Sequence, residues 1–281
     1  MPGLVRRLDL HARQIQLSEM LPPESRSFQL ALQAAHLEQQ DTVAAFAASS
    51  GLASDSTERI MFERHLFNYF AAAVLMPYRR FLRAAVSTGY DLPVLQHRFG
   101  VSFEQLAQRL TTLQRVGERG LPFFMARVDP AGQYSKRYLG ASGADFLEAP
   151  LDAFSTGCPL WQVHRAFARR GEWLVQRVEV DGASPADWTT LSRTLEEALG
   201  AVPNFAVVVG IETRFADELA QVRQLGATRL SPTEIGTGCT RCYRLQCAQR
   251  AWPPSGAALA LHTSHETAAP FEFKSDAETN S

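Results

Sequence analysis

Hydrophobic residues in the first part of the chain recur with the spacing of helices. Phe28, Leu32 and Ala35, for example, would share one face of a helix that follows two prolines. The next apolar run ends at Pro77, which must end or kink a helix because proline lacks the N–H donor of the turn. Ser102 opens a sequence typical of a helical capping box. Four helices are therefore predicted, over residues 24–40, 57–76, 91–99 and 102–115.

The pattern changes after Gly117 and Gly120, where short runs rich in aromatic and β-branched residues predict strands. These strands lie within residues 121–129, 172–180 and 205–212, and helices are predicted over 185–200 and 215–225. Beyond Pro254 no periodic pattern remains, which predicts a poorly ordered tail. The predicted fold class is therefore α+β. Its parts are a helical domain over residues 1–117, a mixed α/β sheet domain over 118–254 and a tail over 255–281.

Composition and charge indicate a globular protein. The chain has 281 residues with 46% hydrophobic content, and 28 Lys and Arg stand against 29 Asp and Glu. Such a near-neutral chain is not a histone-like nucleic-acid binder. Its apolar runs are shorter than the roughly 18 residues that a membrane helix needs, and no signal peptide is recognised. Four cysteines are too few for a secreted disulfide scaffold, so we expect a cytoplasmic protein outside the membrane.

The four cysteines form the clearest candidate site. Cys239, Cys242 and Cys247 follow the spacing C-x2-C-x4-C, and Cys158 lies far upstream, followed by proline. Three local thiolates with one distant thiolate are more typical of an iron–sulfur cluster than of structural zinc, which more often uses two C-x2-C pairs. Arginines between the cysteines would offset the charge of four thiolates. The spacing predicts a 4Fe–4S cluster on all four cysteines, with zinc or four unrelated thiols as the alternatives.

Such a centre would join two segments that are distant in the sequence, the one around Cys158 and the one around Cys247. A metal that ties distant segments stabilises the folded state. The simplest hypothesis is therefore a structural staple, and a redox role is the alternative. His164, six residues after Cys158, is interpreted as a packing residue rather than a partner of the metal ligands.

With these residues in view, the chain resembles the bacterial short-chain fatty acyl transcriptional regulators, which control propionate and glyoxylate metabolism and sense acyl-coenzyme A. The resemblance covers roughly residues 4–254 and rests on LPPESRSFQLAL, NYFAAAVLMPYRRFLRAA, GCPLWQVHRAF and GTGCTRCYRLQCAQRAWPP. It implies a DNA-reading helix-turn-helix, then a helical domain similar to ImmA/IrrE-type metallopeptidases, then a GAF-like domain that carries the cysteines.

The chain departs from this family pattern in two places. The helix-turn-helix is missing, and we recognise no recognition helix and no basic stripe that would neutralise phosphates. DNA contact is therefore expected only through an absent module or a partner. An active peptidase would carry H-E-x-x-H, but here Leu32 and Gln33 replace the first two residues of that motif before His36, and Arg64 stands where a third zinc ligand is expected. A cation there repels Zn²⁺, so we expect no enzyme activity.

The resemblance also implies coenzyme A or a short-chain acyl-CoA as effector, which needs cations for its phosphates and a flat contact for its adenine. The predicted contacts are Arg26, Tyr78, Arg79, Lys136 and Arg137. The predicted function is the acyl-CoA-sensing effector region of a transcriptional regulator of propionate or acetate metabolism, stapled by the cluster and acting as a homo-oligomer. The alternatives are a redox or iron–sulfur enzyme and a zinc-stapled scaffold or dimerisation module.

Overall fold

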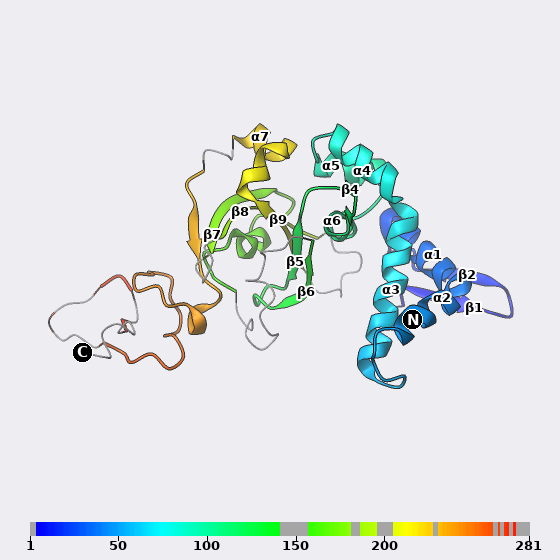
Figure 1. Ribbon diagram of the computed structural model, residues 1–281, viewed down its shortest axis with the longest axis horizontal. Coiled ribbons are helices and arrows are strands. Elements are labelled where there is room, and N and C mark those ends of the chain that lie inside the picture. Colours follow the sequence, from blue (N-terminus) through cyan, green and yellow to red (C-terminus); the bar gives the residue numbers. More distant parts are fainter. Residues whose placement is uncertain are drawn as a thin grey trace.

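The computed structural model describes residues 4–140, 157–180, 186–195, 205–226, 230–260, 264, 267–269 and 272–273 (Figure 1). An N-terminal hairpin pairs β1 (Arg6–Asp9) with β2 (Gln14–Leu17). The helices that follow are α1 (Pro23–Glu38), α2 (Gln40–Ala48), α3 (Thr57–Leu75), α4 (Tyr78–Ser87), α5 (Leu92–Phe99) and α6 (Phe103–Thr111). The hairpin and α1 to α3 lie at the opposite end of the molecule from the cysteine segment (Figure 1).

The four predicted helices are confirmed as α1, α3, α5 and α6, although the last ends at Thr111. Two further helices were not predicted. Helix α2 starts directly after α1, and α4 starts directly after Pro77, because a proline is tolerated just before or in the first turn of a helix. The predicted capping box is confirmed: the Ser102 hydroxyl accepts a hydrogen bond from the Gln105 amide at 3.3 Å, and the Ser102 amide donates to the Gln105 side chain at 3.0 Å.

A buried arginine holds the break between α3 and α4 against α6. Arg109 is only 2% exposed, and its Nε donates to the carbonyl of Met76 at 2.9 Å. Its guanidinium also lies 5.8 Å from the ring centroids of Tyr69 and Tyr78. Burial lowers the pKa of Arg109, so the side chain is kept in an environment that disfavours its charge. The carbonyl and the two rings compensate for that cost.

A six-stranded sheet forms the second half of the described fold, in the order β10-β7-β8-β9-β5-β6. Its strands are β5 (Phe124–Val128), β6 (Tyr134–Leu139), β7 (Leu174–Val180), β8 (Ala186–Thr194), β9 (Ala206–Glu212) and β10 (Thr233–Ile235). Only β10 is parallel to its neighbour. The other elements are the short pair β3 (Gln114–Arg115) and β4 (Glu118–Arg119), α7 (Ala220–Leu225), and the 3-10 helices η3 (Gln162–Phe167), η4 (Thr213–Glu218) and η6 (Cys239–Arg241).

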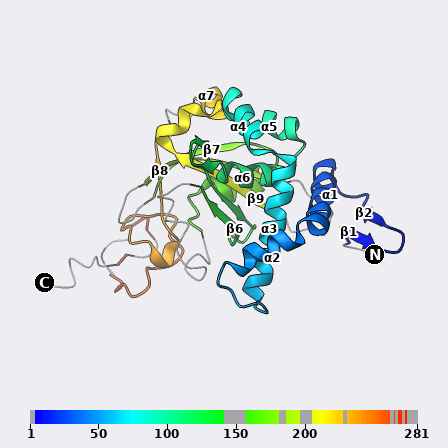
Figure 2. The same ribbon diagram turned by 45° about the vertical axis from the view of Figure 1, so that its right-hand side comes forward.

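Both faces of the sheet are covered, which explains why β9 reads as an uninterrupted apolar run. One face packs against α4, α5, α6 and α7, and Figure 2 shows α6 lying over the sheet. This core cluster runs from Ala72 on α3 to Val222 on α7 and thus joins the helical half to the sheet half. The other face packs against η3 through Trp161 and Val163. The helical part and the sheet therefore share one core.

The centre of the second face depends on a glycine. Gly210 of β9 lies opposite Phe124 of β5, whose ring also meets Trp188 edge-on at 5.1 Å between centroids. A Cβ atom at position 210 would lie 2.2 Å from Cζ of Phe124, which leaves no room for any side chain. The missing side chain of Gly210 therefore creates the space that the aromatic ring fills.

One prediction about the second half was wrong. Residues 186–194, predicted as part of a helix, form the central strand β8. Because both faces of β8 are buried, polar and apolar residues do not alternate along it in the way that reveals a half-exposed strand. Thr190, for example, is 1% exposed and its hydroxyl donates to the carbonyl of Gln176 at 3.2 Å. In the described part of the tail, Leu259 and Phe273 form an antiparallel bridge, and Phe273 is buried. The strands predicted within 121–129, 172–180 and 205–212 are confirmed.

Candidate functional site

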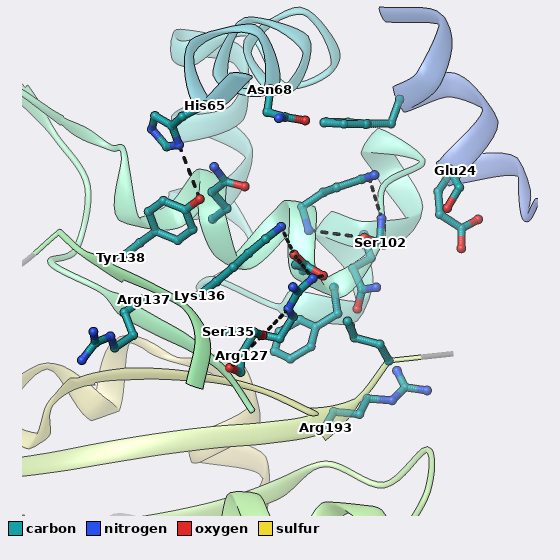
Figure 3. A pocket seen from close by; sticks show the side chains of 18 of the residues that line it. Glu24, His65, Asn68, Ser102, Arg127, Ser135, Lys136, Arg137, Tyr138 and Arg193 are labelled. Carbon is teal, nitrogen blue, oxygen red and sulfur yellow. Dashed lines mark hydrogen bonds and ion pairs between the residues drawn. The ribbon is translucent and has the colours of Figure 1, made fainter. Parts of the chain in front are cut away.

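A cavity of about 780 Å³ lies between the N-terminal helices and the sheet (Figure 3). Its walls come from α1, α3, the α5–α6 region, β5, β6 and the end of β8. The charged side chains that line it are Arg64, Arg127, Lys136, Arg137 and Arg193 together with Glu24 and Glu104. Five cations against two carboxylates make the cavity suitable for an anionic ligand.

Glu104 organises the cations at the centre of the cavity. Its side chain is 15% exposed, and Arg127 donates to its two oxygens at 3.1 and 3.2 Å. Lys136 also donates to Oε1 of Glu104. Figure 3 shows Lys136 extending into the cavity, whereas Arg137 points away from this group. The carboxylate thus fixes two cations at positions that a ligand phosphate would also contact.

One side of the cavity presents rings. His65 of α3 stacks on Tyr138 of β6 with centroids 5.6 Å apart, and the Tyr138 hydroxyl lies 3.5 Å from Nδ1 of His65. Burial and the nearby charge of Lys136 lower the pKa of His65. Phe28 and Phe103 add apolar surface. The cavity therefore combines cations with flat and apolar contacts.

The structure brings only two of the predicted coenzyme A contacts to this cavity, Lys136 and Arg137. Tyr78 is buried, donates to the carbonyl of Glu118 at 2.6 Å and accepts from the amide of Arg115, so it supports the fold. Arg79 is exposed and pairs with Glu118 at 2.9 Å. The guanidinium of Arg26 donates to two nearby carbonyls, those of Leu21 and Glu19. These three residues do not line the cavity, and we therefore exclude them from the proposed site.

Arg127, Arg193, Glu104 and His65 line the cavity but were not predicted from the sequence. They come from β5, β8, α6 and α3, and no local motif joins them. Arg64, predicted only as a disruption of a zinc site, is also a lining residue.

The region that resembles a peptidase has become a packing site. The ring of His36 in α1 packs at a tilt against the ring of Phe67 in α3, with centroids 4.0 Å apart. Burial, and to a lesser extent the charge of Arg6, lower the pKa of His36. Among the described residues, no set of three His, Cys, Asp or Glu side chains is arranged to hold a metal ion here or elsewhere.

The cysteines lie near the edge of the sheet formed by β10. Cys158 stands just before η3, and the backbone amides of Gly236 and Leu160 donate to its sulfur. Burial raises the pKa of Cys158, and the nearby thiols of Cys242 and Cys239 raise it further. The upstream cysteine thus feels the charge of two of its three predicted companions, but the described residues do not gather three cysteine sulfurs in an arrangement that could hold a metal ion. Metal ligation by the four cysteines stays a prediction.

Two features shape the loop that carries the other cysteines. Gly236 leaves room for Cys242, since a Cβ atom at position 236 would lie 2.6 Å from its sulfur. Arg250 is 3% exposed, and its guanidinium donates to four carbonyls of the loop. These belong to Cys239 at 3.3 Å, Cys242 at 3.1 Å, Trp252 at 3.3 Å and Arg244 at 2.5 Å. We call this side chain the Arg250 clamp; it places a positive charge at the centre of the cysteine loop.

His164 lies beside this region as a packed imidazole. Its Nε2 is buried and has no hydrogen-bond partner within the described residues. Burial lowers its pKa. A Cβ atom on Gly157, next to Cys158, would lie 2.7 Å from Nε2. The imidazole of His164 thus lies tightly against the backbone of Gly157, which supports the interpretation that His164 is a packing residue.

Comparisons with known proteins agree with the arrangement of the two halves. Residues 112–271 match the family model of the short-chain fatty acyl coenzyme A regulator C-terminal domain, and residues 1–111 match the family model of the IrrE N-terminal-like domain. In the described part of the chain, no helix is both long and apolar enough to cross a membrane.

Individual relatives are regulators. The chain is 35% identical over 276 residues to the HTH-type transcriptional regulator RamB of Mycobacterium tuberculosis, covering 96% of this chain and 57% of RamB. It is 35% identical over 271 residues to PrpR of the same organism (95% and 54% covered), and 36% identical over 264 residues to a propionyl-CoA carboxylase regulator of Cereibacter sphaeroides (92% and 55%). The chain thus spans little more than half the length of these relatives. A solved Mycobacterium tuberculosis transcriptional regulator superposes with a TM-score of 0.84 at 33% identity, covering 97% of this chain and 81% of that chain.

Proposed function

Because the chain belongs to the family of short-chain fatty acyl coenzyme A regulators, we propose that it is the effector-binding region of a transcriptional regulator and that it binds a short-chain acyl-CoA in the cavity. The relatives are named as regulators, two of them as regulators of transcription, and none as an enzyme, in agreement with the incomplete H-E-x-x-H motif before His36.

The observation that carries this proposal is the combination of surfaces in one cavity. Coenzyme A has several phosphates, which favour arginine and lysine donors such as Lys136, Arg137 and Arg193. Its adenine and acyl group need flat and apolar contacts, which the Tyr138–His65 stack and Phe28 offer. The volume of about 780 Å³ suits a ligand of this size.

The position of the cavity suggests how binding would be transmitted. Its lining comes from both the helical part and the sheet part, so a ligand that contacts both favours one relative arrangement of α1 and α3 against β6. A ligand shifts such an equilibrium only as far as it binds one state more tightly than the other. Sequence-specific DNA reading would belong to a module attached to this region.

Calorimetric titration with coenzyme A, acetyl-CoA and propionyl-CoA tests the proposal. We expect binding of the thioesters, and we expect Lys136→Ala, which removes the cation that extends into the cavity, to weaken it by about 10- to 100-fold, the usual effect of losing a charge-assisted hydrogen bond. Arg26→Ala, outside the cavity, is the matched control and should bind like the original chain. Absence of heat with all three ligands, in a protein that unfolds cooperatively, would contradict the proposal.

We propose in addition that Cys158, Cys239, Cys242 and Cys247 hold an iron–sulfur cluster. The support comes from the spacing C-x2-C-x4-C, from the influence of the Cys242 and Cys239 thiols on Cys158, from the space that Gly236 leaves for Cys242, and from the positive charge of the Arg250 clamp. In the described residues the sulfurs are not yet gathered as ligands of one metal, so binding would have to draw them together. When bound, the cluster would supply a covalent link between the segment before η3 and the loop after β10. The chain's own contribution is to place the four sulfurs and to neutralise their charge.

An anaerobic preparation should be brown, absorb in the visible range and contain iron and acid-labile sulfide. The thiolate ligands of iron–sulfur clusters are the physical reason for the colour. Metal analysis by mass spectrometry on the same sample separates the alternatives. A colourless protein that carries zinc would contradict the cluster and support the zinc staple instead.

A further inference from the structure

A second, shallower groove of about 510 Å³ lies on the outer side of α4 and α5, which lie next to each other in both views of the molecule (Figures 1 and 2). Its lining consists of Arg80, Arg83, Ala84, Ser87, Arg98 and Phe99. We call it the arginine groove. None of these lining residues is acidic.

The fold creates this groove from residues on two helices. Helix α4 buries Phe81, Ala84 and Ala85 toward the core, which turns Arg80 and Arg83 outward to solvent. Arg98 comes from the last turn of α5. The sequence alone shows no basic stripe, because the three arginines converge only after α4 and α5 pack together.

The three guanidinium groups have no acidic partner in the described part of the chain. Arg83 donates through Nε to the backbone carbonyl of Arg79 at 3.3 Å, and Arg80 lies 5.9 Å from the centroid of the Phe99 ring. The neighbouring Arg79 differs, since it pairs with Glu118. In a chain with slightly more acidic than basic residues, three uncompensated arginines in one concave surface favour an external anion.

We propose that the arginine groove binds the sugar–phosphate backbone of duplex DNA, independently of base sequence. This inference rests on the proposed function in so far as a transcriptional regulator works on DNA. Arginines one helical turn apart on α4, with a third on α5, can neutralise neighbouring phosphates and so position the region on the duplex. Single-stranded nucleic acid is less well matched, because it requires exposed rings for stacking and Phe99 is partly buried beneath Arg80.

The test measures fluorescence anisotropy of a labelled, arbitrary duplex of about 20 base pairs with the whole chain over a range of salt concentrations. The double substitution Arg80→Ser and Arg83→Ser should weaken binding at least about tenfold at low salt. It should also reduce the slope of log K against log salt by about two, because each phosphate contact contributes about one. Arg98→Ser alone should reduce the slope by about one.

A matched control removes two exposed arginines elsewhere, Arg165→Ser with Arg169→Ser, and should leave affinity and slope unchanged. Three outcomes overturn the proposal: no duplex binding by the original chain, equal losses in the double variant and the control, or a double variant that loses binding to phosphatidylglycerol vesicles while keeping the duplex. Coenzyme A titration of the same samples reports on the cavity separately. If the protein still binds coenzyme A but does not bind the duplex, only the proposal that the arginine groove binds DNA is contradicted.

Discussion

Replacing Arg250 by methionine is expected to weaken metal binding by the cysteine loop by about 10- to 100-fold, the usual cost of removing a group that orients metal ligands. The change removes the donor of four loop carbonyls, including those of Cys239 and Cys242. It also removes a positive charge from beside the thiolates and the contact of the guanidinium with the Phe273 ring, 4.9 Å away. Iron content after anaerobic desalting, together with visible absorption, measures the effect.

Arg241→Met is the matched control for this change. Arg241 is an exposed arginine of the same loop, so its substitution removes the same charge without removing the clamp. We expect its iron content to equal that of the original chain. Equal loss of iron in both variants would show that overall charge, and not the hydrogen bonds of Arg250, matters. Full iron retention in Arg250→Met would contradict the role of the clamp.

Arg109→Ala is expected to lower the free energy of unfolding by about 3 kcal/mol, through a cavity in the core, an unpaired carbonyl at Met76 and the loss of contacts with two tyrosine rings. The guanidinium ties the end of α3 to α6, and both helices supply walls of the cavity proposed to bind the effector. We therefore expect weaker ligand binding as well. Denaturant unfolding, with the slope checked for constancy, measures the first effect.

Arg109→Lys keeps the charge and one donor and should lose clearly less stability than Arg109→Ala. Because burial lowers the pKa of the arginine, removal of the charge returns part of the lost stability. The measured loss of unfolding free energy therefore shows whether the contacts of Arg109 stabilise the fold by more than the burial of its charge costs. An unfolding midpoint for Arg109→Ala at or above that of the original chain would show that the cost of burying the charge exceeds the value of its contacts.

Local signals made the helical half predictable. The capping box at Ser102 and the break at Pro77 depend on residues within one or two turns, so the start of α6 and the end of α3 could be predicted from the sequence. Strand β8 was missed for the opposite reason. A strand buried on both faces shows no alternation of polar and apolar residues, and the threonines at 189 and 190 find their partners only in the folded sheet.

The same difference between local signals and contacts made only in the folded protein applies to the candidate sites. Cysteine spacing singled out four residues as metal ligands, and that assignment stays a prediction, since the described residues show no arrangement of three ligands. The cavity could not be predicted in this way, because Glu104 and Arg127 meet from different elements. The clamping role of Arg250 was equally hidden, since an arginine between cysteines reads only as a compensating charge until its carbonyl partners are known.

The core that runs from α3 to α7 has a consequence for how this family can change. Met125, Val207 and Val209 of the sheet pack in the same cluster as Phe81, Leu95 and Leu106 of the helices. A substitution on one side alters the shape that the other must fill, and interiors packed at this density tolerate little mismatch. In a chimera that takes only the segment before residue 112 from a distant relative, the helical part and the sheet part would therefore pack poorly against each other. Core residues of the two parts are expected to change together during evolution.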